Sequence, residues 1–231
     1  MKVKIRVVRA ISSPEATEKY VSGHYKVLES YGVTKVTSAD RSWMNNPNVY
    51  LLLVESEDGE RMLGGGRVQL RSEGFPLPLE GAILEKDNRI IEYMKRFEDL
   101  KVAEYCGLWN SKEVSGYGIG SIYLIRIGVA LTSFLNLNCL MAFCSPFTVA
   151  NSQAVGLRII EELGDNGTFL YPKEGLVATI MEVENVRTLE RAKPEEKNFI
   201  FDLRQNPKQT KLLSSKMGEM EVEFDLNLEK L

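Results

Sequence analysis

The stretch "VSGYGIGSIYLIRIGVALTSFL" (residues 114–135) places three glycines, two residues apart, directly before a long apolar run. Glycine has no side chain to pack, so Gly116, Gly118 and Gly120 indicate that the backbone itself is used there. A glycine-rich turn lets a ligand approach the backbone, and the helix that follows directs N–H groups and positive potential toward an anion. The stretch therefore predicts a phosphate-binding loop followed by a helix over residues 121–137.

Two well-known glycine loops do not fit this stretch. The letters "GYGIGS" lack the GxGxxG spacing of a dinucleotide-binding fold, and no acidic residue follows about 20 residues later at the end of a strand. The Gly-Lys-Ser/Thr ending of a Walker loop is also absent. Both classes of nucleotide-binding protein are therefore excluded.

The amino-acid composition narrows the classes of protein to which the chain could belong. With 44% hydrophobic and 26% charged residues, the chain of 231 residues has the balance of a soluble globular protein. Its net charge of -3 predicts no attraction to nucleic acid or to an anionic membrane. The most apolar stretch, 119–144, contains Arg126 and two asparagines, so no membrane span is expected. The three cysteines lack the spacing of a metal site or a disulfide framework, which favours a cytoplasmic protein without a metal.

Hydrophobic periodicity predicts a mixed α/β fold, that is, an α+β mixed sheet flanked by helices. Strands are expected at 3–9, 48–56, 61–71, 101–110, 139–144 and 177–185, and helices at 14–30, 88–99, 121–137 and 148–164. The segment 73–82 is expected to be a proline-broken loop. After the last of these strands, the sequence predicts a charged linker over residues 189–197. Two stretches with strand-like alternation follow it, "NFIFDLR" (198–204) and "EMEVEFDLNL" (219–228).

This order of elements resembles the GNAT superfamily of N-acyltransferases. Gly118 and Gly120 match the last two positions of the family's loop, and Ser115 stands where the family usually has Gln or Arg. Asn151 and Ala154 match its Asn-x-x-Ala pattern. The resemblance implies a GNAT-like acyltransferase domain over residues 1–188 with a C-terminal extension over residues 189–231. It also implies a loop that binds the pyrophosphate of acyl-CoA or acetyl-CoA through Gly116, Tyr117, Gly118, Ile119, Gly120 and Ser121.

A subset of the superfamily looks closer, namely the acyl-homoserine-lactone (autoinducer) synthases and the related N-acyl amino acid synthases. "GGGRVQL" (64–70) resembles their Gly-x-x-Arg-Leu stretch. Their next strand carries a Glu, which matches Glu104, and an Arg three residues later, where this chain has Gly107. The resemblance implies that the acyl donor is acyl-CoA, with an acyl-carrier protein as the alternative donor and partner.

Acyl transfer to an amine needs a group that removes a proton, and three residues are candidates for the site. Glu104 lies mid-strand between apolar neighbours, where burial would raise its pKa into the range of a general base; the alternative is an exposed edge position. Arg67 could bind an acceptor carboxylate through its fork of donors, or lie on the surface of a hairpin. Trp109 could line the acyl pocket or pack in the core.

Other reactive residue types are expected to be structural. Arg126 interrupts an apolar helix, so it either pairs with a carboxylate or reaches phosphate. Arg158, at the position of a tyrosine common in the family, is expected to be solvated on a helix. The cysteines Cys106 and Cys144 are expected to be buried apolar groups. A Ser–His or Cys–His triad would have to use His24, the only histidine, so triad chemistry is not expected.

The sequence thus predicts an N-acyltransferase that moves an acyl group from acyl-CoA, or from an acyl-carrier protein, to a small-molecule primary amine such as an amino acid. The alternative is a non-catalytic GNAT-like module that binds an acyl carrier or another protein. The sequence leaves the oligomeric state open.

Overall fold

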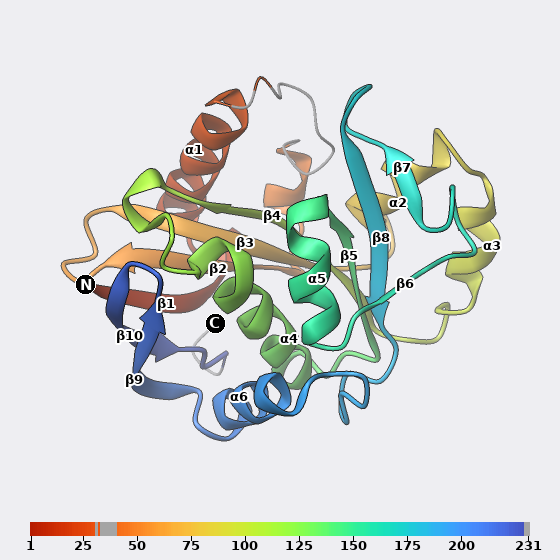
Figure 1. Cartoon of the computed structure of the whole chain (residues 1–231). Coiled ribbons are helices and arrows are strands. Elements are labelled where there is room, and N and C mark those ends of the chain that lie inside the picture. Colours follow the sequence, from red (N-terminus) through yellow and green to blue (C-terminus); the bar gives the residue numbers. More distant parts are fainter. Residues whose placement is uncertain (31, 33–40, 229–231) are drawn as a thin grey trace.

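The computed structural model describes residues 1–30, 32 and 41–228 (Figure 1). The strands are β1 (Lys2–Arg9), β2 (Val49–Ser56), β3 (Met62–Leu70), β4 (Val102–Asn110), β5 (Cys139–Cys144), β6 (Arg158–Ile159), β7 (Thr168–Leu170), β8 (Val177–Val183), β9 (Lys208–Ser215) and β10 (Gly218–Asp225). The helices are α1 (Pro14–Ser30), α2 (Pro78–Leu84), α3 (Arg89–Lys95), α4 (Leu124–Phe134), α5 (Pro146–Ala154) and α6 (Pro194–Gln205). A π-helical turn, Ile119–Tyr123, leads into α4.

These strands form one mixed sheet with the order β6-β8-β5-β4-β3-β2-β1-β10-β9, and β7 pairs with β8 beside β6. Neighbours are antiparallel except β4 with β5 and β1 with β10, which are parallel. The mixed sheet flanked by helices confirms the fold class expected from the sequence. Within the described chain, no helix combines the length and apolar character that a membrane span requires.

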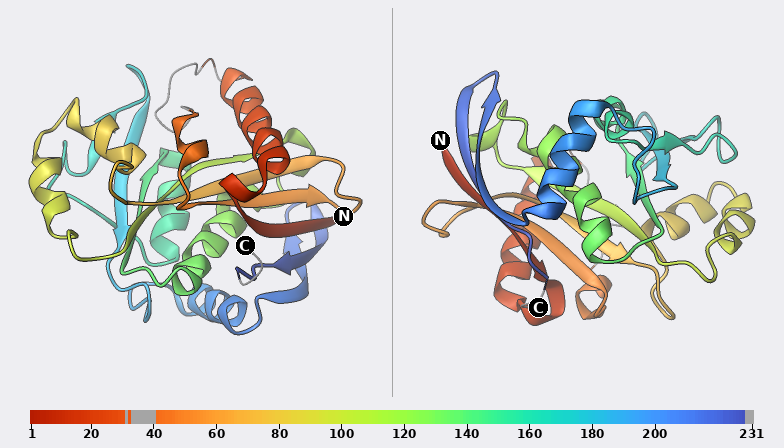
Figure 2. Two further views of the ribbon diagram at one scale, coloured as in Figure 1. Left: turned by 180° about the vertical axis from the view of Figure 1, so that it is seen from behind. Right: turned by 90° about the horizontal axis from the view of Figure 1, so that it is seen from below.

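The helices cover the two faces of the sheet in different ways (Figure 2). On one face, α4 and α6 pack over the largest core cluster, which includes Leu124, Ile127 and Leu203. The opposite face carries two smaller clusters. One lies under α1 around Tyr20 and Trp109, and the other lies under α2 and α3. The central strands β4 and β5 therefore have a helix layer on both sides.

Strands β4 and β5 separate halfway along their length. Their paired register runs only from Val102 opposite Cys139 to Glu104 opposite Met141. Beyond that point β4 bulges, and its register against β3 shifts between Gly65 and Arg67. Gly107 in the bulge has φ +60°, a conformation that disfavours residues with a Cβ. This local requirement explains why a glycine stands at position 107.

Two segments before residue 189 differ from the expectation, one at the start of a helix and one at the end of a helix. The segment expected to be a proline-broken loop contains α2, which begins at Pro78, a favourable first helical position. The helix expected over 148–164 ends at Ala154, since Gly156 adopts φ +104° and the chain turns into β6. Arg158 consequently lies in a strand. It forms ion pairs with Glu182 of β8 and with Glu184 just after that strand, so the prediction that it is solvated on a helix was wrong.

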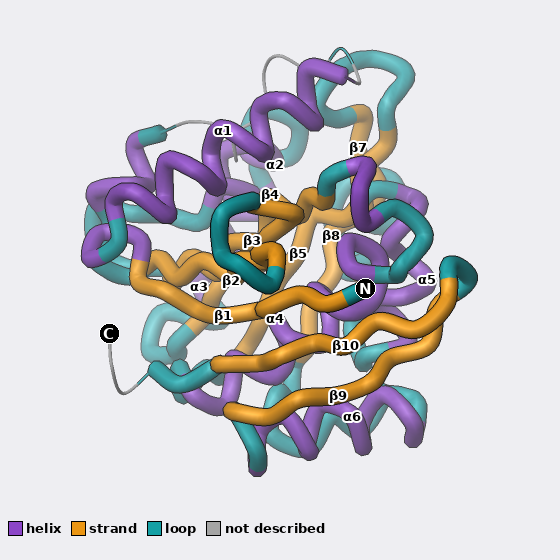
Figure 3. The backbone as a smooth tube through the Cα atoms, turned by 90° about the vertical axis from the view of Figure 1, so that its left-hand side faces the viewer, coloured by secondary structure: helices purple, strands orange, loops and turns teal. Residues whose placement is uncertain are grey.

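The C-terminal segment is built into the same sheet (Figure 3). β10 pairs with β1, and β9 with β10. The stretch "NFIFDLR", expected as a strand, belongs to α6. The buried residues of this helix, Glu196, Ile200 and Leu203, follow helical spacing. Arg126 of α4 donates two hydrogen bonds to Glu196, at 2.5 and 2.7 Å. Of the two alternatives for Arg126, pairing with a carboxylate is therefore the one the structure has.

Candidate active site

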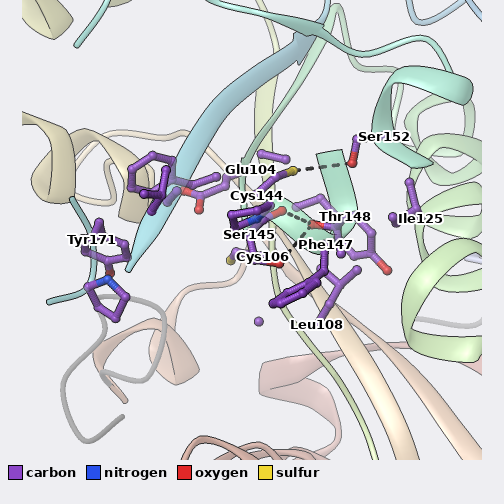
Figure 4. Close-up of a pocket in the computed structure, with 18 of the residues that line it drawn as sticks. Glu104, Cys106, Leu108, Ile125, Cys144, Ser145, Phe147, Thr148, Ser152 and Tyr171 are labelled. Carbon is purple, nitrogen blue, oxygen red and sulfur yellow. Dashed lines mark hydrogen bonds between the residues drawn. The ribbon is translucent and has the colours of Figure 1, made fainter. Parts of the chain in front are cut away.

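A cavity of about 540 Å³ opens where β4 and β5 separate (Figure 4). β4 supplies Glu104, Cys106 and Leu108 to its wall, and β5 supplies Ala142 and Cys144. Apolar side chains from α4, from the start of α5 and from the end of the loop before β8 make up most of the remaining wall. The split sheet thus creates an apolar cavity with one carboxylate in it.

Glu104 is buried in this cavity, with 2% of its surface exposed. Burial raises the pKa of its carboxyl to about 7, because desolvation disfavours the charged form. Three interactions act against this rise: the N–H of Leu79 donates to Oε2 at 2.7 Å, Arg67 contributes positive charge, and the Cys106 side chain interacts with the carboxylate. A carboxyl that titrates near pH 7 is suited to accept a proton from an ammonium group.

The backbone of α2 fixes the orientation of this carboxylate. Leu79 is in the first turn of α2, where N–H groups have no partner within the helix and bind anions readily. Leu79 and Glu104 are 25 residues apart in the chain. The sequence reading missed this contact because it placed a loop where α2 lies, although Pro78 followed by Glu80 was a usable signal for a helix start.

The cysteines near the carboxylate are thiols. Cys106 is buried, and desolvation raises its pKa to about 12. Cys144 is buried too, its pKa is raised by desolvation, and its Sγ lies 3.4 Å from Ser152 Oγ. Neither group is poised to form a thiolate nucleophile at neutral pH. Both cysteines are therefore neutral thiols in the cavity wall.

The glycine loop presents unpaired backbone donors at the start of α4. The N–H groups of Gly118, Ile119 and Gly120 donate to no acceptor in the described part of the chain. The next three N–H groups, beginning at Ser121, all point to the carbonyl of Gly118, at 3.0 to 3.3 Å. Consecutive free N–H groups before a helix form a concave site for phosphate oxygens. These three are among the six residues, 116–121, that the sequence predicts to hold the donor's pyrophosphate, whereas the N–H of Tyr117 donates to the Val114 carbonyl at 3.2 Å.

Two of the glycines have separate structural reasons. Gly118 adopts φ +83°, the left-handed conformation that begins the turn. Gly120 lies so close to the side chain of Asn110 that any Cβ would collide with it. The loop is also held from α5, because Asn151 Nδ2 donates to the carbonyl of Ser121 at 2.8 Å. Asn151, which matches an Asn-x-x-Ala pattern in the sequence, thus links the glycine loop to α5 through this hydrogen bond.

The other two site residues expected from the sequence are buried outside the cavity wall. Arg67 is 1% exposed, lies opposite Cys106 in the β3–β4 register, and stacks its guanidinium 4.5 Å from the ring centroid of Trp43. Trp109 is 5% exposed and packs beneath α1 against Gly23. Among the described residues that line the cavity, neither of them is found. A role for either in substrate binding remains a prediction.

One cavity residue was set aside at the sequence level. His24, on α1, lines the cavity although it lies 80 residues before Glu104 in the printed sequence. No local pattern marks it, since its place depends on how α1 packs over β4. Within the described chain, no cluster of three or more His, Cys, Asp or Glu side chains could hold a metal ion.

Comparison with known proteins identifies the fold. No family model matches the chain, and no curated protein matches it in sequence. Solved structures do match: FeeM, an N-acyl amino acid synthase from uncultured soil microbes, aligns with a TM-score of 0.62 at 13% identity, covering 85% of this chain and 97% of FeeM. The chain has the GNAT acyltransferase fold.

Two further solved structures match this chain over most of their length. MesI, a CoA-dependent acyl-homoserine lactone synthase, matches with a TM-score of 0.54 at 14% identity, covering 87% of this chain and 95% of MesI. ElaA of Escherichia coli matches with a TM-score of 0.52 at 11% identity, covering 79% of this chain and 99% of ElaA. The expected resemblance is confirmed at the level of the GNAT fold, and the activity has to be argued from the site itself.

Proposed function

We propose that this protein is an N-acyltransferase that moves an acyl group from acyl-CoA to a primary amine. The observation that carries the proposal is the position of Glu104. It is a buried carboxyl with a pKa of about 7, at the point where β4 and β5 separate. The unpaired N–H groups of the glycine loop at the start of α4 support the same proposal, since they suit a donor with phosphate groups.

The proposed reaction proceeds by direct attack. Glu104 accepts a proton from the acceptor's ammonium group, and the amine nitrogen then attacks the thioester carbonyl carbon of the donor. This attack forms the C–N bond and gives a tetrahedral intermediate, whose collapse restores the carbonyl and breaks the C–S bond. The second amine proton passes to the departing sulfur, so that CoA leaves as a thiol. The Leu79 N–H holds the carboxylate in place through these steps, at 2.7 Å from Oε2.

The cavity favours an acyl chain longer than acetyl. Its volume of about 540 Å³ lies within the range of ordinary ligand pockets, roughly 300–1,000 Å³. Leu108, Ile125, Val129 and Leu140 are among the apolar side chains that line it. Burying each methylene of an acyl chain against such a wall contributes about 0.8 kcal/mol. The finer assignment, to an amino acid as acceptor, rests on the resemblance of the sequence to N-acyl amino acid synthases.

A donor and acceptor screen tests the proposal. Thermal stability is measured with CoA, acetyl-CoA and acyl-CoAs of eight to sixteen carbons, and release of free CoA thiol is followed with a panel of primary amines and amino acids. We expect the longer donors to stabilise the protein most, by roughly 2.7 kcal/mol at 100 times their Kd, and to release thiol only with an amine present. Binding without turnover would support the alternative of a non-catalytic module. Turnover with an acylated carrier protein alone would show that the donor is the carrier protein and not acyl-CoA.

A further inference from the structure

His24 is a polar residue of the cavity that the proposed mechanism does not yet use. It lies on α1, lines the cavity, and is 6% exposed. Its Cε1 would be 3.6 Å from a Cβ placed on Gly107, so the imidazole packs directly over the bulge of β4. One turn earlier on α1, Tyr20 donates a hydrogen bond to the Gly107 carbonyl at 2.6 Å. The helix is therefore anchored at the bulge, which gives His24 a fixed place.

The imidazole of His24 makes no hydrogen bond with any other residue that the structure describes. A neutral imidazole carries one N–H donor and one acceptor nitrogen, and burying both without partners is costly. The surroundings keep it neutral: burial first, and then the charge of Arg67, lower its pKa to about 4. His24 is thus an uncharged donor and acceptor on the wall of an otherwise largely apolar cavity.

His24 and Glu104 approach the cavity from the same side of the sheet. Glu104 receives its hydrogen bond from α2, and His24 comes from α1; the clusters under these helices share one face. The glycine loop leads into α4 on the opposite face, where the Tyr105 hydroxyl donates to the Leu124 carbonyl. A donor held at the loop would reach the split between the strands from the α4 side. The acceptor then has to approach from the α1 and α2 side.

We propose that His24 contacts the acceptor directly, as a hydrogen-bonding partner of the primary amine substrate on the α1 side of the cavity. The inference rests on the proposed function, because it assigns a role within the same site. In this arrangement Glu104 takes the proton, and the neutral acceptor nitrogen of His24 receives an N–H of the amine or ammonium group. His24 thereby orients the acceptor and does not itself change its protonation state.

The first test uses the fact that the chain has a single histidine. Histidine labelled in the ring with ¹⁵N gives one set of imidazole signals, which can be followed while hexylamine is added, with and without CoA. Hexyltrimethylammonium is the matched probe, since it has the same chain and charge but no N–H. We expect hexylamine to shift the imidazole signals and the trimethyl analogue to leave them in place. No shift with saturating hexylamine, or equal shifts with both, would overturn the proposal.

The second test separates acceptor binding from structure. His24→Phe keeps a planar ring without hydrogen-bonding atoms, and His24→Asn keeps a donor and an acceptor. We expect the Phe variant to raise the KM for the amine about tenfold or more, with donor affinity unchanged within about twofold, and the Asn variant to recover part of the loss. Tyr20→Phe is the control, because it loosens α1 from Gly107 without altering a cavity-lining residue. Equal effects of His24→Phe and Tyr20→Phe on both substrates would assign His24 a structural role.

The two proposals can fail separately. If the wild-type protein transfers no acyl group from any donor, the proposed function is wrong, and the imidazole signals of the wild type still decide whether His24 binds an amine. If transfer occurs and neither the imidazole signals nor the amine KM responds, the role of His24 is wrong and the proposed function stands.

Discussion

The two sides of the split between β4 and β5 are built from different kinds of groups. On the α4 side, the glycine loop offers backbone N–H groups from residues that are adjacent in the chain. On the α1 and α2 side, the cavity wall takes Glu104 from β4 and His24 from α1, and a backbone N–H from α2 orients the carboxylate. The first side is a local structure, whereas the second exists only after three distant segments have packed together.

This difference has a chemical consequence. Backbone groups carry fixed partial charges, so the anion binding proposed for the loop needs no ionisable side chain. The side chains on the other face depend on burial, which raises the pKa of Glu104 and lowers that of His24. Binding at the loop should therefore be insensitive to pH near neutrality, whereas events at Glu104 should follow its ionisation.

The largest expected effect is on turnover in Glu104→Gln, which keeps the shape of the side chain and removes the base. General-base catalysis is typically worth about 10²–10⁴-fold, so we expect kcat to fall at least a hundredfold at pH 7 with donor affinity unchanged. Part of the loss should be recovered at higher pH, where more amine is unprotonated. Glu85→Gln, at an exposed carboxylate beyond α2, is the control. A loss below about threefold between pH 6 and 9 would make Glu104 structural.

The same substitution should stabilise the fold at alkaline pH. The pKa of Glu104 is about 7 in the folded protein against an ordinary value of 4.5, so its contribution is fully present below pH 4.5 and is lost as pH rises through 7. That difference corresponds to roughly 3 kcal/mol at most. Glu104→Gln should therefore unfold at higher denaturant concentration than the wild type at pH 8.

At pH 4 this advantage should vanish. Arg67, Glu80 and Cys106 are the titratable groups facing the carboxyl, from β3, α2 and β4, and they are present in both proteins. The pKa of His24 is lowered, so its contribution to the free energy of unfolding is lost as pH falls. This contribution is the same in the wild type and in Glu104→Gln and cancels when the two are compared. Equal unfolding midpoints of the two proteins at pH 8 would show that the carboxyl is not desolvated.

A smaller effect is expected on donor binding in Gly118→Val. A branched side chain disfavours φ +83° and obstructs the approach of phosphate to the loop, so we expect donor affinity to fall about tenfold or more. Gly59→Val is a matched control. Gly59, at the β2–β3 turn, also has a positive φ of +78° but lies in open space, so valine there introduces the backbone strain without obstructing a binding site. Calorimetric titration with CoA measures both. Equal donor affinities of the two variants would remove the phosphate role from the loop.

The smallest effect is expected for Asn151→Ala, which removes the hydrogen bond that α5 makes to the carbonyl of Ser121. A neutral hydrogen bond contributes about 0.5–1.5 kcal/mol, so donor affinity should fall by roughly two- to tenfold. The amine KM should not change, because the contact lies on the donor side. A change in the amine KM alone would contradict the separation of the two sides.

The glycine turn before α4 could be predicted because it depends on adjacent backbone groups and on a helix that follows directly. The periodic strands and the first helix could be predicted for the same reason, since their patterns are local. The pattern failed at residues 198–204, where alternating apolar letters fit a strand, while the buried positions in the fold follow the turns of α6. It failed at Arg158 because one glycine ends the helix before it.

By itself the sequence determined most of the strands and helices, the glycine turn at 116–121 and the candidacy of Glu104, because each depends on residues close together in the chain. Only the tertiary structure decided that Leu79 orients this carboxylate, that His24 lines the cavity, and that Arg67 and Trp109 lie outside its described wall. These positions depend on how α1 and α2 pack over a strand that bulges at Gly107. Packing is set by the summed burial of many distant side chains, which leaves no mark in the local order of residues.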